Sequence, residues 1–187
     1  MGAGVLILDY GSQYTRLIAR RVREERVYCE IRPPDFSADE IREWDPAGLI
    51  LSGGPSSVYD EGVPGLDPEL LELGVPVLGI CYGMQLIGDR AGGDVRGAEN
   101  REYGRAELEV TEPDELFHGF EAGEETPVWM SHGDQLAEPP PGYVALARTE
   151  TTPVAAFRAG DREVYGVQFH PEVVHTPRGE EILENFV

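Results

Sequence analysis

The 187-residue sequence predicts an α/β domain with an open, mostly parallel sheet, helices on both faces and extra antiparallel strands in its C-terminal half. Two observations predict this class. In the first half, short apolar runs alternate with segments of helical periodicity, as in a parallel sheet covered by helices. In the second half, several strand-like runs follow one another with no helical pattern between them. The length favours one domain, so we expect residues 1–187 to form a single unit.

The first half supplies the expected parallel strands, at residues 5–8, 27–31, 48–51 and 75–80. The first helix is expected where Tyr14, Ile18 and Val22 recur at helical spacing. A second helix should start at Ser37, because Ser37 and Glu40 form a capping box. A third helix is expected near residues 66–73.

The second half begins with Ala106, Leu108 and Val110, which alternate with charged residues and predict a strand with one buried face. Further strands are expected at residues 128–130, 144–147, 154–157 and 164–169. The last helix should begin near Thr176 and Pro177, with the proline in its first turn.

Charge excludes several classes of function. Thirty-five acidic and fifteen basic residues give a net charge of -20, so we expect neither nucleic acid nor a membrane surface as partner. All fifteen basic residues are arginines, and the absence of lysine excludes Walker-type phosphate loops and Schiff-base enzymes. Such a composition fits a cytosol of high ionic strength, or GC-rich codon usage with ordinary acidity.

The sequence reads as a soluble, cytoplasmic protein with reduced thiols. Residues 1–4 run straight into the first strand, without a basic leader or a long apolar stretch. The two cysteines, Cys29 and Cys81, form no CxxC motif, and the histidine spacings fit no common zinc pattern. No metal site is therefore expected.

The most informative segment joins an apolar strand to a helix through Gly79-x-Cys81-x-Gly83. This pattern is the cysteine counterpart of the G-x-S-x-G nucleophile elbow, and it would expose Cys81 at the tip of the strand. The helix N-terminus would favour the thiolate, and the amide of Tyr82 could bind an oxyanion. The alternative is a buried cysteine in an ordinary turn, which is how we interpret Cys29.

A thiol nucleophile needs a base and a group that orients the base. His170 lies at the end of a predicted strand, with Glu172 two residues further on. Pro171 restricts His170 to extended angles, so the carboxylate could hold one imidazole nitrogen while the other faces the sulfur. A histidine at such a place could also be an ordinary surface or core residue. His132 is a second candidate, because Trp129, Ser131 and Asp134 surround it in what we interpret as a turn.

A glycine loop, Ser52-Gly53-Gly54-Pro55, follows another predicted parallel strand. Its small residues leave backbone N–H groups free to bind an anion, so it could supply a second oxyanion donor beside Tyr82. A plain turn is the alternative.

Together, the glycine loop, the elbow at 79–85 and the Phe-His-Pro-Glu segment at 169–172 resemble the class I glutamine amidotransferases over essentially the whole chain. The resemblance implies a flavodoxin-like fold and hydrolysis of L-glutamine through a cysteine thioester. The implied catalytic triad is Cys81, His170 and Glu172, with the amides of Gly54 and Tyr82 as oxyanion donors. The implied substrate-binding residues are Gly53, Gln85, Ser131, His132 and Gly133.

Three further segments, at 9–15, 129–134 and 170–176, resemble the glutaminase components of GMP synthases. This implies an ATP-pyrophosphatase domain or subunit as partner, which would use the ammonia to convert XMP to GMP. We expect no cofactor in this chain, with ATP and Mg²⁺ on the partner, because residues 52–56 lack the aspartate of a pyrophosphatase loop. The chain stops at Val187, so we expect a domain or subunit without the pyrophosphatase and dimerisation parts.

Three other functions are weighed against this one. A glutaminase serving an anthranilate, carbamoyl-phosphate or CTP synthase would share the triad. A cysteine peptidase or chaperone on the same scaffold would share the elbow without needing the arrangement at 169–172. A regulatory subunit without activity would be expected to have lost Cys81, His170 or Glu172, and all three are present.

Overall fold

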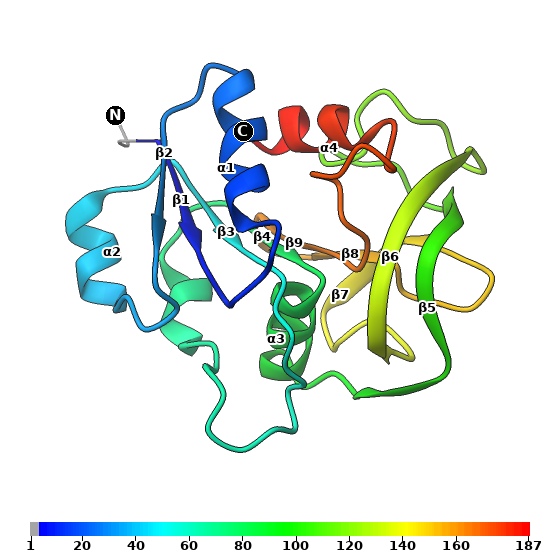
Figure 1. Ribbon diagram of the computed structural model, residues 1–187, viewed down its shortest axis with the longest axis horizontal. Helices are drawn as coiled ribbons and strands as arrows, with labels where there is room; N and C mark the ends of the chain where they lie inside the picture. The colour runs from blue at the N-terminus through cyan, green and yellow to red at the C-terminus, as the bar shows by residue number, and fades with distance from the viewer. Residues whose placement is uncertain (1–3) are drawn as a thin grey trace.

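The computed structural model contains one nine-stranded sheet with helices on both faces (Figure 1). It describes residues 4–187, apart from the side chains of residues 99 and 100. Residues 1–3, which entered the expectation that no leader is present, lie outside the described residues. The strand order is β2-β1-β3-β4-β9-β8-β7-β5-β6, parallel from β2 to β9 and antiparallel beyond. The predicted mixed sheet is therefore confirmed.

The parallel half consists of five short strands, of which β1, β3, β4 and β9 are buried along their whole length, whereas the edge strand β2 is fully buried only at Cys29. They are β1 (Val5–Leu8), β2 (Cys29–Arg32), β3 (Gly48–Leu51), β4 (Val77–Ile80) and β9 (Val164–Val167). In β1, Val5 and Ile7 belong to one hydrophobic core, and Leu6 and Leu8 belong to the other. Alternate residues thus face opposite cores, which explains why the four fully buried strands are apolar throughout, while β2 carries Glu30 and Arg32.

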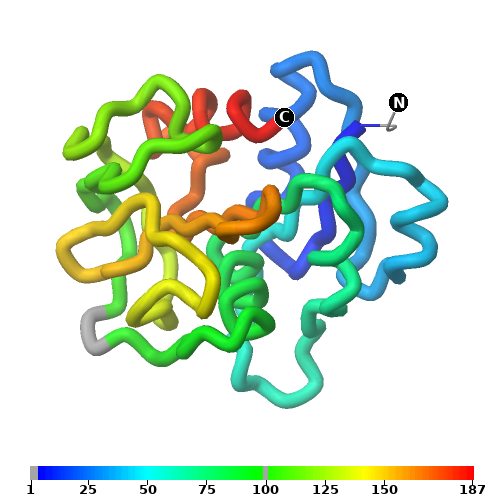
Figure 2. Tube along the Cα trace, turned by 180° about the vertical axis from the view of Figure 1, so that it is seen from behind, coloured from blue at the N-terminus to red at the C-terminus, as the bar shows by residue number. Residues whose placement is uncertain are grey.

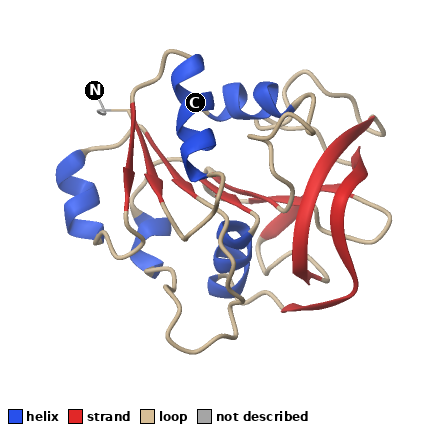
Figure 3. Cartoon of the chain, viewed as in Figure 1, coloured by secondary structure: helices blue, strands red, loops and turns tan. Residues whose placement is uncertain are grey.

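Each core is closed by its own set of helices (Figure 3). One face carries α1 (Thr15–Glu24) and α4 (Gly179–Phe186). The other face carries α2 (Ala38–Trp44), the short η1 (Pro68–Glu72) and α3 (Tyr82–Arg90). The capping box predicted at Ser37 is present, with Glu40 bonded back to the Ser37 amide.

Two helix predictions needed correction. Residues 66–73 form only the five-residue 3₁₀ helix η1, because Pro68 opens it and Gly74 follows with a φ of +76°. The last helix begins at Gly179, so Pro177 lies before it rather than in its first turn. The hydroxyl of Thr176 bonds the carbonyl of His170, which keeps this stretch in a turn.

The antiparallel half contains β5 (Val95–Val110), β6 (Glu125–Leu136), β7 (Tyr143–Arg148) and β8 (Ala156–Ala159). β5 and β6 form a long ribbon at the edge of the molecule, also visible from behind in Figure 2. The turn expected around His132 is instead part of β6. Pairing with β5 satisfies its backbone, and a polar composition alone did not reveal that pairing.

The site of interest lies where the parallel strands end. The carboxyl ends of β1, β3, β4 and β9 meet at one edge, and they lead into residues 9–14, 52–57, Cys81 and 168–172 respectively. Ligands of open α/β sheets bind at this edge. Within residues 4–187, no helix has the length and apolar character that a membrane crossing requires.

We predict that Gly79→Ala destabilises the chain by about 1–3 kcal/mol, a typical cost of overpacking. A Cβ at Gly79 would lie 2.6 Å from the carbonyl of Gly83, so α3 would have to shift away from the sheet. Urea unfolding measures the effect. Gly65→Ala is the control, because its nearest neighbour would be 3.9 Å away. Equal unfolding free energies for the two variants would contradict the prediction.

Candidate active site

Cys81 occupies a strained turn between β4 and α3. Its φ of 53° lies in the left-handed region, which is uncommon for a residue with a side chain. The turn is held on the strand side by the Cys81 amide, which donates to the carbonyl of Val167 at 2.8 Å. The predicted elbow is therefore present, with the sulfur at the edge of the sheet.

His170 and Glu172 form the predicted pair. The His170 Nδ1 and Glu172 Oε1 atoms are 2.8 Å apart, and both side chains are buried. The segment is a turn rather than the extended dipeptide that the sequence suggested, yet the two groups meet. His170 and Cys81 also flank Gly53, where an added Cβ would lie 3.4 Å from the His170 ring and 3.6 Å from the Cys81 Cβ.

The backbone of His170 is fixed to the antiparallel half of the sheet. Its amide donates to the carbonyl of Trp129 at 2.9 Å, and its carbonyl accepts from the Thr176 hydroxyl at 2.7 Å. The same hydroxyl accepts from the Trp129 amide at 3.0 Å, and the His175 ring packs on the Trp129 indole. The segments around Trp129 and Thr176 thus hold the histidine in place.

The charge state of His170 follows from its neighbours. Burial by itself would lower its pKa, but hydrogen bonding with Cys81 and the charge and hydrogen bond of Glu172 outweigh burial. Together they raise the pKa of His170 from 6.5 to about 10. The imidazole therefore holds its proton at neutral pH, next to a buried carboxylate.

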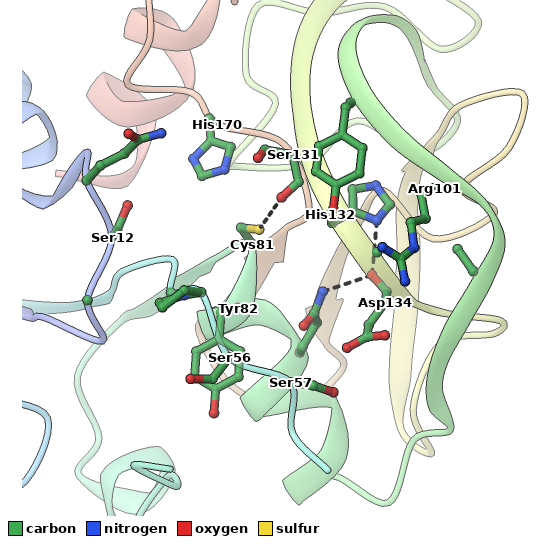
Figure 4. A pocket seen from close by; sticks show the side chains of 18 of the residues that line it. Ser12, Ser56, Ser57, Cys81, Tyr82, Arg101, Ser131, His132, Asp134 and His170 are labelled. Atoms are coloured by element: carbon green, nitrogen blue, oxygen red, sulfur yellow. Dashed lines mark hydrogen bonds between the residues drawn. The ribbon is translucent and has the colours of Figure 1, made fainter. Parts of the chain in front are cut away.

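The sulfur of Cys81 has two further polar neighbours. Its thiol points to the carbonyl of Ser131 at 3.6 Å, and the amide of Gln168 donates to it at 3.6 Å. Figure 4 shows His170 and Ser131 on either side of the sulfur. The sequence analysis missed Gln168, although it lies two residues before His170 in the segment that directly follows β9, and this position is the signal that could have found it.

Cys81, Ser131 and His170 line one open pocket of about 690 Å³. It contains most of the predicted site: Cys81, His170, Gly54, Tyr82, Gln85, Ser131, His132 and Gly133. Gln85 is fixed at its amide, which donates to the carbonyl of Asp134 at 2.9 Å and to Gln168 at 3.3 Å. Glu172 lies behind His170, outside the lining.

The glycine loop closes the pocket on the other side. A Cβ at Gly54 would lie 2.6 Å from the carbonyl of Tyr10 and 3.1 Å from the Tyr82 ring. Only glycine allows this close approach of the loop to the start of α3. The loop thus packs directly against the elbow, and its role as an oxyanion donor stays a prediction.

His132 has a structural environment that the sequence did not indicate. Its ring is buried, with Nδ1 3.0 Å from the Asp134 carbonyl and Nε2 3.3 Å from the Thr152 hydroxyl. Glu102 accepts from Thr152 and from Thr149 and lies 3.5 Å from His132. Burial alone would raise the pKa of Glu102, but its hydrogen bonds with His132 and the threonines lower that pKa to about 2. The network fixes the backbone of β6 beside Cys81.

Comparison with known proteins decides the family. The family described as "Glutamine amidotransferase class-I" matches residues 6–187. The chain belongs to this family. The resemblance found in the sequence is thereby confirmed, and with it the fold class and the assignment as a glutamine amidotransferase.

The curated relatives of this amidotransferase include glutamine-hydrolysing GMP synthases. The sequence is 53% identical to the one from Natranaerobius thermophilus and 54% identical to the one from Caldanaerobacter subterraneus, over 98% of the chain in each case. The chain spans only 36% and 35% of their lengths. The expectation that residues 1–187 form one amidotransferase domain, without the pyrophosphatase and dimerisation domains, stays a prediction.

Solved structures agree on the fold. A "putative gmp synthase subunit a protein" from Thermoplasma acidophilum superposes with a TM-score of 0.81 and 33% identity, over 97% of this chain and 90% of that chain. PurLQS from Thermotoga maritima superposes with a TM-score of 0.79 at 20% identity, over 100% of this chain and 98% of that one, which supports the fold alone.

Among the side chains that the structure describes, which exclude those of residues 1–3, 99 and 100, no three His, Cys, Asp or Glu groups are arranged to hold a metal ion. The expectation that this chain needs no metal or cofactor stays a prediction.

We predict that His170 remains protonated well above neutral pH, with a pKa near 10, when its ring is followed by NMR. In Glu172→Gln the pKa of His170 should fall, because the carboxylate that stabilises the imidazolium is gone while burial still destabilises it. Because the pKa of His170 is raised in the folded state, its protonation adds to the free energy of unfolding. This contribution is complete below about pH 6.5 and is lost as the pH rises toward 10. Urea unfolding should show this slope in the wild type and a flatter one in Glu172→Gln.

Glu180→Gln, an exposed change on α4, is the control and should keep the wild-type slope. A His170 ring that loses its proton at or below pH 6.5 in the wild type would contradict the prediction.

Proposed function

We propose that this chain hydrolyses L-glutamine to glutamate and ammonia through Cys81, and that a synthetase partner uses the ammonia to convert XMP to GMP. The observation that carries the first part is the meeting of three side chains from distant parts of the sequence. Cys81 lies in a strained elbow at the sheet edge, beside a His170 held 2.8 Å from Glu172.

In the first step, the Cys81 sulfur attacks the side-chain amide carbon of glutamine. His170 already holds the proton that the sulfur gives up, because its raised pKa keeps the imidazole protonated at neutral pH. Glu172 keeps the ring oriented and balances the imidazolium charge, as the third member of a triad does.

The tetrahedral intermediate carries its negative charge on the former amide oxygen. We assign the amides of Gly54 and Tyr82 as the donors that bind it. The Tyr82 amide is the first of α3 and has no partner within the helix, and the Gly54 loop packs against Tyr82. Each such donor is typically worth about 100–1000-fold in rate.

Collapse of the intermediate breaks the C–N bond, and His170 gives its proton to the leaving nitrogen, which departs as ammonia. The γ-glutamyl group stays on Cys81 as a thioester. Water then attacks the thioester with His170 as base, the C–S bond breaks, and glutamate leaves with the thiol restored.

The amino-acid end of glutamine would lie along β6. Ser131 and Gly133 line the pocket there, and Gln85 faces them from α3, while Gly53 packs between the nucleophile and His170. His132 contributes its backbone, because its ring is turned into the network with Glu102.

The choice of acceptor rests on the relatives. Proteins more than 50% identical to this chain are named glutamine-hydrolysing GMP synthases, and this chain matches about a third of their length. We assign the use of ATP, Mg²⁺ and XMP to a separate ATP-pyrophosphatase domain or subunit.

The test is release of ammonia and glutamate from glutamine, measured with and without the pyrophosphatase half of a GMP synthase, XMP and ATP. Cys81→Ala should lower the rate at least about 1000-fold, as loss of a nucleophile does. Cys29→Ala is the matched control, because this thiol is buried in the hydrophobic core away from the pocket and donates to the carbonyl of Ala19. Its rate should equal that of the wild type.

A Cys81-dependent rate that rises with the loaded partner supports both parts of the proposal. A Cys81-dependent rate that ignores the partner would overturn GMP synthesis as the destination of the ammonia. No release under either condition would overturn the glutaminase assignment.

A further inference from the structure

Arg101 lines the Cys81 pocket but takes no part in the proposed reaction. Among the described residues that line the pocket, Arg101 is the only arginine, and Asp60 and Asp134 are the carboxylates. Figure 4 shows Arg101 near His132 and Asp134, on the side of the pocket formed by β5 and β6. Although the chain has a net charge of -20, this arginine gives the pocket a group that can bind an anion.

The pairing of the two strands explains why Arg101 faces the pocket. Glu102 lies opposite His132 in the ladder, and both side chains belong to the buried network on one face. Successive side chains of a strand point to opposite faces. Arg101, Ser131 and Gly133 therefore share the other face, and all three line the pocket.

The side chain of Arg101 lies over the backbone of β6. A Cβ at Gly133 would be 3.6 Å from Arg101 Nε and 3.7 Å from its Cδ. Arg105, on the same strand, pairs with Glu107, whereas Arg101 forms no ion pair with any side chain that the structure describes. Its guanidinium is therefore available to a ligand in the pocket.

The distance from the nucleophile suits an amino acid. The Ser131 carbonyl contacts the Cys81 sulfur, and Gly133 lies two residues further along β6, or about 6.6 Å away. In an extended glutamine, four bonds and about 5 Å separate the side-chain amide carbon from the α-carboxylate carbon. A glutamine whose amide lies on the sulfur thus brings its carboxylate beside Gly133, within reach of Arg101.

We propose that the Arg101 guanidinium binds the α-carboxylate of glutamine and selects an amino acid over an amide that lacks this carboxylate. The planar fork of arginine matches a carboxylate with two parallel hydrogen bonds. The inference rests on the proposed glutaminase function, because it assumes that glutamine reacts at Cys81. It adds a specificity residue that the sequence motifs did not include.

The test is calorimetric binding to the 187-residue chain carrying Cys81→Ala, which removes turnover. L-Glutamine is compared with L-glutaminamide, whose α-carboxylate is replaced by a neutral amide. Arg101→Gln should raise the Kd for glutamine about 10- to 100-fold, the usual loss for a hydrogen bond to a charged group. It should leave the Kd for glutaminamide within about twofold, whereas Arg101→Lys should restore part of the glutamine affinity. Arg105→Gln is the matched control and should change neither.

In the chain with Cys81 intact, Arg101→Gln should raise KM for glutamine by a similar factor with kcat little changed. Equal glutamine affinity with and without Arg101 would overturn the inference and leave the proposed function standing. Equal weakening of glutamine and glutaminamide would also overturn it, because it would indicate a structural role. Failure of the parent chain both to bind and to hydrolyse glutamine would overturn the proposed function and this inference with it.

Discussion

The turn at Cys81 is the constraint on which the rest of the site depends. A residue with a side chain is held there at a φ of 53°, which costs about 1–3 kcal/mol and persists only when its surroundings impose it. The surroundings are glycines: a Cβ at Gly83 would lie 2.4 Å from the carbonyl of Leu51, and Gly79 has no room for one either. Close packing of α3 on the sheet therefore places both the sulfur and the helix N-terminus at the edge.

The antiparallel half of the sheet supplies the rest of the site, because its strands β5 and β6 line the pocket beside Cys81. His170 follows β9, but its backbone is bonded to Trp129 of β6 and to Thr176. The Ser131 carbonyl of β6 contacts the sulfur, and the Glu102 network holds that part of β6 from behind. The ribbon of β5 and β6 thus provides one wall of the pocket and holds the backbone of His170.

Much of this was predictable from the sequence, since the relevant signals are local. The apolar runs gave β1 and β3 at their observed bounds, and G-x-C-x-G predicted the elbow because only glycines allow such a turn. The pair His170 and Glu172 was found from a spacing of two residues. What was missed depends on contacts between distant segments: polar residues 131–134 form a strand only through β5, and Glu102, Gln168 and Arg101 gain a role only from their neighbours in space.

The proposed reaction passes through a covalent bond between glutamine and Cys81. The decisive measurement is mass spectrometry of the chain mixed with glutamine, quenched in acid within the first turnovers and digested. The expected result is a γ-glutamyl thioester on the peptide that contains Cys81 and none on the peptide that contains Cys29. Release of glutamate without any adduct on Cys81, in the wild type and in a Glu172→Gln variant alike, would contradict the assignment of Cys81 as the nucleophile.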